Sequence, residues 1–316
     1  MGDDPHSEIT GPLLFLIGPT GSGKTDLSLR LAERIGGEII SADSRLFYRG
    51  MDIGTAKPSP RERSRVPHHL IDVVDPDQTF TLAQFQVAAI ASVRSIQSRG
   101  RLAIVVGGTG QYIRALTQGW QLPQESHNPG LRKALEIWLA GLGANRALEG
   151  LRVLDPETAG RIDSRNPRRM VRAWEVILRT GRPMAEQRKR GKPIEPALLV
   201  GLSLPRPLLY QRLDARLEAM LAAGFLEEVA SLNRRGYSDD APALTAIGYR
   251  ELGAHLRGET TFAEALVLIR RRTRTLVRRQ ANWFKPGDPD LHWFSGDPDP
   301  LDSILELIQD RGLWHN

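Results

Sequence analysis

Residues 18–25 read Gly18-Pro19-Thr20-Gly21-Ser22-Gly23-Lys24-Thr25 and match the phosphate-binding loop pattern G-x-x-x-x-G-K-[ST] at every position. The apolar run 12–17 before the loop has the length of a strand, and apolar residues continue at helical spacing over residues 26–35. In such a strand–loop–helix unit, backbone N–H groups and the positive end of the helix bind an anion. The flanking strand and helix argue against the alternative, a glycine-rich turn without a ligand. We therefore expect the chain to bind a phosphorylated compound, a di- or triphosphate.

The composition is that of an ordinary globular protein. The 316 residues are 41% hydrophobic and 25% charged, and no apolar run approaches the roughly 20 residues that span a bilayer. The N-terminus carries Asp3 and Asp4 rather than a basic segment followed by an apolar stretch, so no secretory signal is predicted. The lack of cysteine excludes disulfides, thiol nucleophiles and cysteine-ligated zinc. Together these features predict a cytoplasmic protein.

The order of expected elements predicts an α/β core that carries an α-helical insertion. Strands and helices alternate over residues 12–119 and again over 197–316, which indicates a parallel sheet with helices on both faces. Residues 120–196 show helical periodicity without a convincing strand, and residues 1–11 are expected to be a flexible leader. Further strands are expected at 38–42, 68–76, 101–106 and 198–204, and further helices at about 81–96, 131–142, 147–154, 168–178, 207–223, 226–233, 247–256 and 262–284.

The ends of two expected strands bear on the chemistry. Strand 101–106 closes on Gly107-Gly108-Thr109-Gly110, where a phosphate-loop ATPase usually carries a Walker-B carboxylate. Asp43 follows strand 38–42 and should face the phosphate loop, because ligands of an open α/β sheet bind at the carboxyl ends of its strands. The missing carboxylate at the end of strand 101–106 argues against nucleotide hydrolysis as the main activity.

Arginine is concentrated in two segments that predict contact with a polyanion. The net charge is +6, and only six of the 43 basic residues are lysines. Residues 161–192 hold eleven basic and three acidic residues, for which a solvated surface is the alternative interpretation. On the helix expected at 262–284, apolar residues share one arc, which predicts a helix docked on the core with its outer face toward phosphates. That outer face would carry Arg270, Arg271, Arg272, Arg274, Arg278 and Arg279.

Several motifs together resemble those of the bacterial tRNA dimethylallyltransferases. The most specific is Met51-Asp52-Ile53-Gly54-Thr55-Ala56-Lys57-Pro58, and the similarity runs from about residue 12 to at least residue 285. The resemblance implies a phosphate-loop NTPase-like core with a helical tRNA-binding insertion. It also implies transfer of a dimethylallyl group from its diphosphate to N6 of the adenosine just 3′ of the anticodon, in tRNAs that read codons beginning with U. The other motifs that carry it are residues 18–25, 41–44, 67–72, 106–109, 248–250 and 278–280.

The resemblance implies that the leaving group is pyrophosphate and that the phosphate loop binds it. Lys24 would neutralise the charge that develops on the pyrophosphate, and Mg²⁺ held by the Thr25 hydroxyl would assist. Arg216 is implied to approach the same group, and an exposed helical arginine is the alternative interpretation.

The resemblance also assigns residues to the acceptor. Asp43 would accept a hydrogen bond from N6 and take its proton as the new bond forms, although an aspartate that only caps the next turn is the alternative. Thr109 and Ser44 would contact the base or its sugar-phosphate, after the adenine leaves the loop stack. Contacts with tRNA are implied for Asp43, Ser44, Arg45, Leu46, Thr109, Arg132, Arg168, Arg169, Met170, Val171, Arg172, Thr245, Gly248, Tyr249, Arg250, Arg278, Arg279, Gln280 and Lys285.

Three positions depart from the family pattern, so individual base contacts do not transfer there. Leu46 and Arg168 stand where Gln is common, and Asn282 stands where Thr is common. The alternative functions are a small-molecule kinase, a transferase acting on free adenine nucleotides, and an RNA-binding module with a vestigial phosphate loop. The first two have no use for the arginines, and the third leaves Lys24 and Asp43 without a role. We expect a monomer, because the RNA supplies the partner surface.

Overall fold

The computed structural model describes residues 9, 11–120, 122, 128–187, 196–285 and 287–314. The chain forms two compact units, Met1–Thr117 with Pro193–Asn316, and Gln118–Lys192. Most of the predicted leader, residues 1–8 and 10, lies outside the described residues, as do Arg188, Lys189, Arg190 and Lys192 of the first basic segment.

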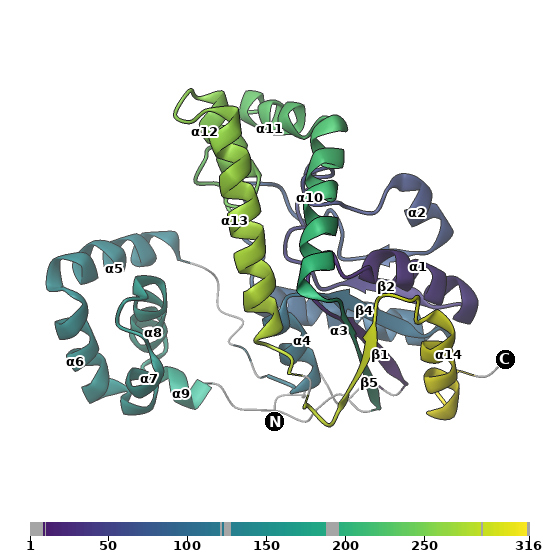
Figure 1. Ribbon diagram of the computed structural model, residues 1–316. Helices are drawn as coiled ribbons and strands as arrows, with labels where there is room; N and C mark the ends of the chain where they lie inside the picture. The colour runs from purple at the N-terminus through teal and green to yellow at the C-terminus, as the bar shows by residue number, and fades with distance from the viewer. Residues whose placement is uncertain are drawn as a thin grey trace. The chain divides into compact units, whose positions relative to one another are not determined.

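In the described part of the first unit, six parallel strands form one sheet (Figure 1). They are β1 (Leu13–Ile17), β2 (Glu38–Ser41), β3 (His68–His69), β4 (Ala103–Gly107), β5 (Ala197–Ser203) and β6 (Leu291–Ser295). Their order is β3-β2-β4-β1-β5-β6, so β1 lies inside the sheet between β4 and β5. This confirms the predicted phosphate-loop NTPase-like class and places the carboxyl ends of β1, β2 and β4 side by side.

Two strands differ from the prediction. The strand expected at 68–76 is only His68–His69 long, because Leu70 and Asp72 adopt positive φ angles of 60° and 57° that end the extended run. The Asp72 carboxylate holds this turn by accepting a 2.5 Å hydrogen bond from Lys57 Nζ. Strand β6 has no counterpart among the expected strands, since five residues between turns rich in Asp and Pro give too short a pattern.

Helices cover both faces of this sheet. The Thr81 capping box is confirmed, because the Thr81 hydroxyl accepts from Gln84 N and Gln84 Oε1 accepts from Thr81 N. No described helix is long and apolar enough to cross a membrane. The helices of this unit are α1 (Lys24–Ile35), α2 (Pro60–Arg65), α3 (Leu82–Gln97), α4 (Gly110–Thr117), α10 (Arg206–Ala222), α11 (Phe225–Arg234), α12 (Tyr249–Leu256), α13 (Phe262–Ala281) and α14 (Leu301–Asp310).

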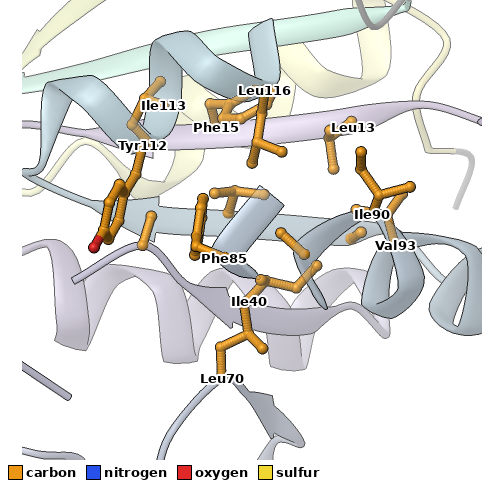
Figure 2. Packing of buried hydrophobic residues seen from close by; sticks show 14 of the residues in the cluster. Leu13, Phe15, Ile40, Leu70, Phe85, Ile90, Val93, Tyr112, Ile113 and Leu116 are labelled. Atoms are coloured by element: carbon orange, nitrogen blue, oxygen red, sulfur yellow. The ribbon is translucent and has the colours of Figure 1, made fainter. Parts of the chain in front are cut away.

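The alternation of side chains along β1 builds the core on both sides of the sheet. Leu13 and Phe15 point to the face covered by α3 and α4, where Phe85 stacks on Tyr112 with ring centroids 4.4 Å apart (Figure 2). Leu14 and Leu16 belong to the opposite core, against α1 and α14. A strand buried on both faces is typical of a parallel sheet, and it gives the phosphate loop after β1 a rigid base.

The second unit, as far as it is described, is helical, in agreement with the periodicity of its sequence. Its core is closed by Leu135, Leu151 and Trp174, which are buried from three different helices. The helices are α5 (Pro129–Leu142), α6 (Ala144–Leu154), α7 (Pro156–Arg161), α8 (Pro167–Thr180) and α9 (Met184–Gln187).

Candidate active site

The phosphate-binding loop follows β1, and its glycines are required by the backbone. Gly18, Gly21 and Gly23 have φ angles of 153°, 84° and 96°, a region that disfavours side chains. A Cβ on Gly18 would also lie 2.5 Å from the carbonyl oxygen of Leu202 in β5. Helix α1 begins at Lys24 without a side-chain cap, so its first N–H groups are available to an anion.

Two neighbouring cavities adjoin this loop. The smaller cavity, of about 340 Å³, is lined by Lys24, Thr25 and other residues of the loop. The larger cavity, of about 440 Å³, is lined along α10 and α13 by apolar side chains such as Leu217 and Ile269. The residues that line both cavities, called the border residues below, are Thr20, Asp43, Thr55, Gly108, Arg216 and Gln280.

Two cations, Lys24 and Arg216, and the Asp43 carboxylate dominate the electrostatics around the border residues. Burial lowers the pKa of Lys24 to about 8; the Asp43 carboxylate opposes this shift and the Arg216 guanidinium adds to it. Burial also lowers the pKa of Arg216, again against the influence of Asp43. The Lys24 ammonium donates to Pro19 O at 2.6 Å, and Arg216 Nη2 donates to Thr55 O at 3.4 Å. Two desolvated cations beside free N–H groups are suited to a polyanion such as pyrophosphate.

Asp43 lies directly beyond β2, as its position after an expected strand predicts. Its Oδ1 accepts a 3.0 Å hydrogen bond from Arg45 N, so the turn-capping interpretation holds for one oxygen. Among the described residues no donor is hydrogen-bonded to Oδ2. Asp43 borders both cavities, so the second oxygen remains available to accept a proton from a group bound there.

Gln280 connects α13 to the phosphate loop. Its side-chain Oε1 accepts a 2.9 Å hydrogen bond from Thr20 N. A Cβ on Gly108 would lie 2.6 Å from Gln280 Nε2 and 2.8 Å from the carbonyl oxygen of Gly18, so the end of β4 packs closely against this side chain and against the loop. The resemblance implied a tRNA contact for Gln280, and the structure adds a second partner, the loop itself.

Six of the other residues predicted to contact tRNA line one of the two cavities. Arg45 Nη1 donates to Pro242 O at 3.1 Å and approaches Thr245 Oγ1 at 3.5 Å, which joins the segment after β2 to the segment before α12. Leu46 lines the smaller cavity. The predicted residues that line the larger cavity are Asp43, Ser44, Arg45, Thr109, Thr245, Arg279 and Gln280.

Three residues predicted to touch tRNA have buried side chains. Tyr249 is 1% exposed, and its hydroxyl donates to Glu228 Oε1 at 2.5 Å, so its side chain is not available to RNA. Met170 and Val171 are each 3% exposed, because they lie on the apolar face of α8 and pack into the core of the helical unit. The side chains of these three residues are therefore covered in the RNA-free protein, and their contact with tRNA stays a prediction.

The arginines of α13 do not form the single outer face that the sequence predicts. Arg270 pairs with Glu218 at 2.5 Å, and Arg274 pairs with Asp214 at 2.8 Å. Arg272 pairs with Glu251, which is 3% exposed. Acids on α10 and α12 thus hold these three arginines in the RNA-free protein, and their contact with phosphates stays a prediction. No carboxylate in the described part of the chain pairs with the remaining Arg271, Arg278 and Arg279.

In the helical unit, one buried acid organises two of the predicted RNA-binding arginines. Glu175 is 1% exposed, and its Oε2 lies 3.0 Å from Arg172 Nη1 and 3.8 Å from Arg132 Nη1. Arg168 and Arg169, one turn earlier on α8, are exposed and form no ion pair with a described carboxylate. Glu175 therefore holds Arg132 and Arg172 in place, whereas Arg168 and Arg169 have no ion-pair partner among the described carboxylates.

Sequence reasoning missed Glu228, which holds the most specific motif of the chain. The Glu228 carboxylate accepts from the backbone N–H groups of Asp52, Ile53 and Gly54. No local signal points to it, since the contact spans about 175 positions and a glutamate on an amphipathic helix is ordinary.

Comparison with known proteins connects this geometry to one family. The sequence profile of the IPP transferase family matches residues 46–287. The chain is similar to the tRNA dimethylallyltransferase of Roseiflexus sp. strain RS-1, with 50% identity over 274 residues that cover 87% of this chain and 90% of the relative. The enzyme of the same name from Moorella thermoacetica is 45% identical over 308 residues, 95% of this chain and 94% of the relative. The crystal structure of the tRNA isopentenylpyrophosphate transferase of Bacillus halodurans is similar with a TM-score of 0.69, 36% identity and 96% coverage of each chain.

Proposed function

The chain belongs to the IPP transferase family, and we propose that it transfers a dimethylallyl group from dimethylallyl diphosphate to N6 of the adenosine 3′-adjacent to the anticodon, in tRNAs that read codons beginning with U. It is accordingly a prenyltransferase that acts on tRNA. One observation supports this donor and acceptor: the Asp43 carboxylate, which lines both cavities, is close enough to Lys24 and Arg216 to influence the pKa of each.

The proposed reaction forms one bond and breaks one. The lone pair of adenine N6 attacks C1 of the dimethylallyl group, and the bond from C1 to the diphosphate oxygen breaks with its electron pair leaving on pyrophosphate. The N6 lone pair is delocalised into the ring, so the amine is a poor nucleophile unless a base takes its proton during the attack. The unbonded Oδ2 of Asp43 accepts that proton as the carbon–nitrogen bond forms, while Oδ1 stays fixed by Arg45 N.

Pyrophosphate departs into the smaller cavity. The N–H groups at the start of α1, Lys24 and Arg216 offset the negative charge that develops on the leaving oxygen. The exposed Thr25 hydroxyl lines this cavity and fits Mg²⁺, a hard cation that takes oxygen ligands and uses few protein groups when phosphates supply the rest. When bound, Mg²⁺ would neutralise part of the pyrophosphate charge.

The acceptor adenine is placed in the larger cavity, after it leaves the anticodon-loop stack. Ser44, Thr109 and Thr245 line that cavity and offer hydroxyl groups to the base or its sugar-phosphate. We assign residues 120–196 as the tRNA-binding insertion and residues 12–119 with 197–316 as the catalytic core. A tRNA substrate places the enzyme in the cytoplasm, where it acts as a monomer because the RNA supplies the partner surface.

The test is transfer of radiolabelled dimethylallyl diphosphate, with Mg²⁺, into an unmodified anticodon stem-loop RNA. Label in the RNA, located on the adenosine 3′ of the anticodon, is the expected result. Transfer of phosphate from ATP without prenylation would support the kinase alternative. RNA binding without either reaction would support the binding-module alternative.

The pH dependence of pyrophosphate binding should report Lys24. Its pKa of about 8 in the ligand-free protein means that Lys24 is positive below pH 8 and neutral above it. A polyanion binds the positive form, so the association constant should fall as pH rises above about 8, approaching roughly tenfold per pH unit. Calorimetry of Mg²⁺-pyrophosphate measures this, and Lys24→Ala in the same pH series subtracts the ionisation of pyrophosphate itself. Equal pH profiles for the two proteins would contradict the assignment.

Salt dependence should report the free arginines of α13. Arg271, Arg278 and Arg279 have no described carboxylate partner, so replacing all three by alanine should remove phosphate contacts. The slope of log K against log salt for stem-loop RNA should become shallower by about two units. The matched control replaces Arg30, Arg65 and Arg257, which pair with carboxylates and lie outside the predicted contacts, and it removes the same charge. An equal change in slope for both triple variants would show a general charge effect and overturn the assigned surface.

A further inference from the structure

We propose that Glu228 is a positioning residue for pyrophosphate departure, because it fixes the loop at residues 51–58 whose Thr55 carbonyl holds Arg216. The inference rests on the proposed function and deepens it. In this proposal the motif at residues 51–58 does not contact the substrate. Its role is to orient the Arg216 guanidinium.

The Glu228 carboxylate, half-buried on α11, is hydrogen-bonded to the loop through both oxygens. Oε2 accepts from Asp52 N and Ile53 N, each at 2.8 Å, and Oε1 accepts from Gly54 N at 3.0 Å. The Tyr249 hydroxyl donates to Oε1 at 2.5 Å. Three successive N–H groups form the kind of concave anion site that proteins use for phosphate. Here the protein's own carboxylate fills it, and the loop is held in one conformation.

The aromatic side chains around this site leave room only for glycine. A Cβ on Gly54 would lie 2.0 Å from Phe225 Cε2 and 2.7 Å from Tyr249 Cε2. Phe225 and Tyr249 pack edge to face, with ring centroids 5.0 Å apart. The loop is therefore pressed against α11 and α12 at Gly54, and Glu228 can reach its backbone.

The charged side chains of the motif are also used internally. Lys57 has a side chain that is 1% exposed, and its ammonium donates to Tyr48 O at 2.8 Å, Asp52 Oδ1 at 2.6 Å and Asp72 Oδ1 at 2.5 Å. A lysine with three oxygen partners in a buried position has no free donor for a diphosphate. The motif thus contributes to the site through its fixed backbone conformation, not through the charge of Lys57.

Thr55 connects this fixed backbone to the border residues. It lies next to Gly54, lines both cavities, and its hydroxyl donates to Met51 O at 2.6 Å, which closes the loop on itself. The Thr55 carbonyl accepts from Arg216 Nη2 at 3.4 Å. A guanidinium on a long side chain loses much rotamer freedom when it is held, so a fixed carbonyl pre-orients Arg216 before pyrophosphate binds.

The test is a double-mutant cycle between Glu228→Gln and Arg216→Ala, read by calorimetry with Mg²⁺-pyrophosphate and by kcat for transfer. In Glu228→Gln the amide presents a donor to N–H groups that need an acceptor, so the loop loses part of its support. We expect about tenfold weaker pyrophosphate binding and a similar loss in kcat, with an unchanged KM for RNA. In the Arg216→Ala background the same substitution should change binding less than about twofold. Glu227→Gln, an exposed neighbour on α11, is the matched control and should behave as wild type.

Equal effects of Glu228→Gln in both backgrounds would overturn the proposal, because Glu228 would then act on stability alone. If Glu228→Gln fails to fold, Tyr249→Phe removes only one hydrogen bond to the same carboxylate and should give a smaller loss that again vanishes without Arg216. Pyrophosphate binding does not depend on transfer. A wild-type protein that binds pyrophosphate but labels no RNA would therefore refute the proposed function, while the cycle still decides the role of Glu228.

Discussion

Replacing Asp43 by alanine should lower kcat/KM for prenyl transfer by roughly 10²–10⁴-fold, the usual contribution of a general base, while RNA binding is retained. The loss follows from the acceptor, an amine whose lone pair is delocalised and whose proton must leave as the bond forms. Single-turnover transfer of labelled dimethylallyl diphosphate measures the chemical step, and a filter-binding titration with the same RNA measures affinity.

Asp43→Asn separates proton transfer from turn capping. The asparagine carbonyl can still accept the hydrogen bond from Arg45 N, which is 3.0 Å from Asp43 Oδ1, so the turn after β2 should persist. The amide cannot take a proton at neutral pH, so the loss should match that of alanine. Nearly normal activity in Asp43→Asn with a large loss in Asp43→Ala would instead assign Asp43 to the turn and remove it from the chemistry.

The parts of the site that depend on short segments could be predicted from the sequence. The phosphate loop needs only glycines, a lysine and a threonine between a strand and a helix, and all of these are local. Asp43 follows from one further rule, since parallel strands end at the same edge of a sheet. The same reasoning fails for the strand expected at 68–76, because Leu70 and Asp72 adopt positive φ angles and Asp72 pairs with Lys57 and Arg63, which lie outside the expected strand.

The parts that depend on pairing between distant segments could not be predicted. Arg270 and Arg274 look like RNA ligands on a helical wheel, and only the packing of α10 against α13 shows that Glu218 and Asp214 hold them. Glu228 is a second example. The motif at residues 51–58 is recognisable by resemblance, but nothing in its sequence shows which carboxylate accepts hydrogen bonds from its backbone N–H groups. A periodic charge pattern identifies a helix face but not its partners.

Lys24→Ala should lower kcat for transfer by roughly 10²–10³-fold, because it removes a desolvated cation from the place where negative charge develops on the leaving pyrophosphate. In the ligand-free protein the Lys24 ammonium donates to Pro19 O at 2.6 Å and to Ser22 Oγ at 3.4 Å, so it is already held at the loop that receives the anion. Burial disfavours that charge most, the Asp43 carboxylate offsets part of the cost, and the Arg216 guanidinium adds to it. The enzyme thus keeps a costly cation in position, and a bound polyanion would stabilise it further.

The measurement is single-turnover transfer together with calorimetry of Mg²⁺-pyrophosphate. Both rate and affinity should fall in Lys24→Ala, while the affinity for stem-loop RNA should stay within about twofold, because Lys24 lines only the smaller cavity. Lys24→Arg keeps the charge on a bulkier, planar head and should recover part of the pyrophosphate affinity without the full rate. Transfer within threefold of wild type in Lys24→Ala would mean that the leaving group is stabilised elsewhere, with Arg216 as the remaining cation at the border.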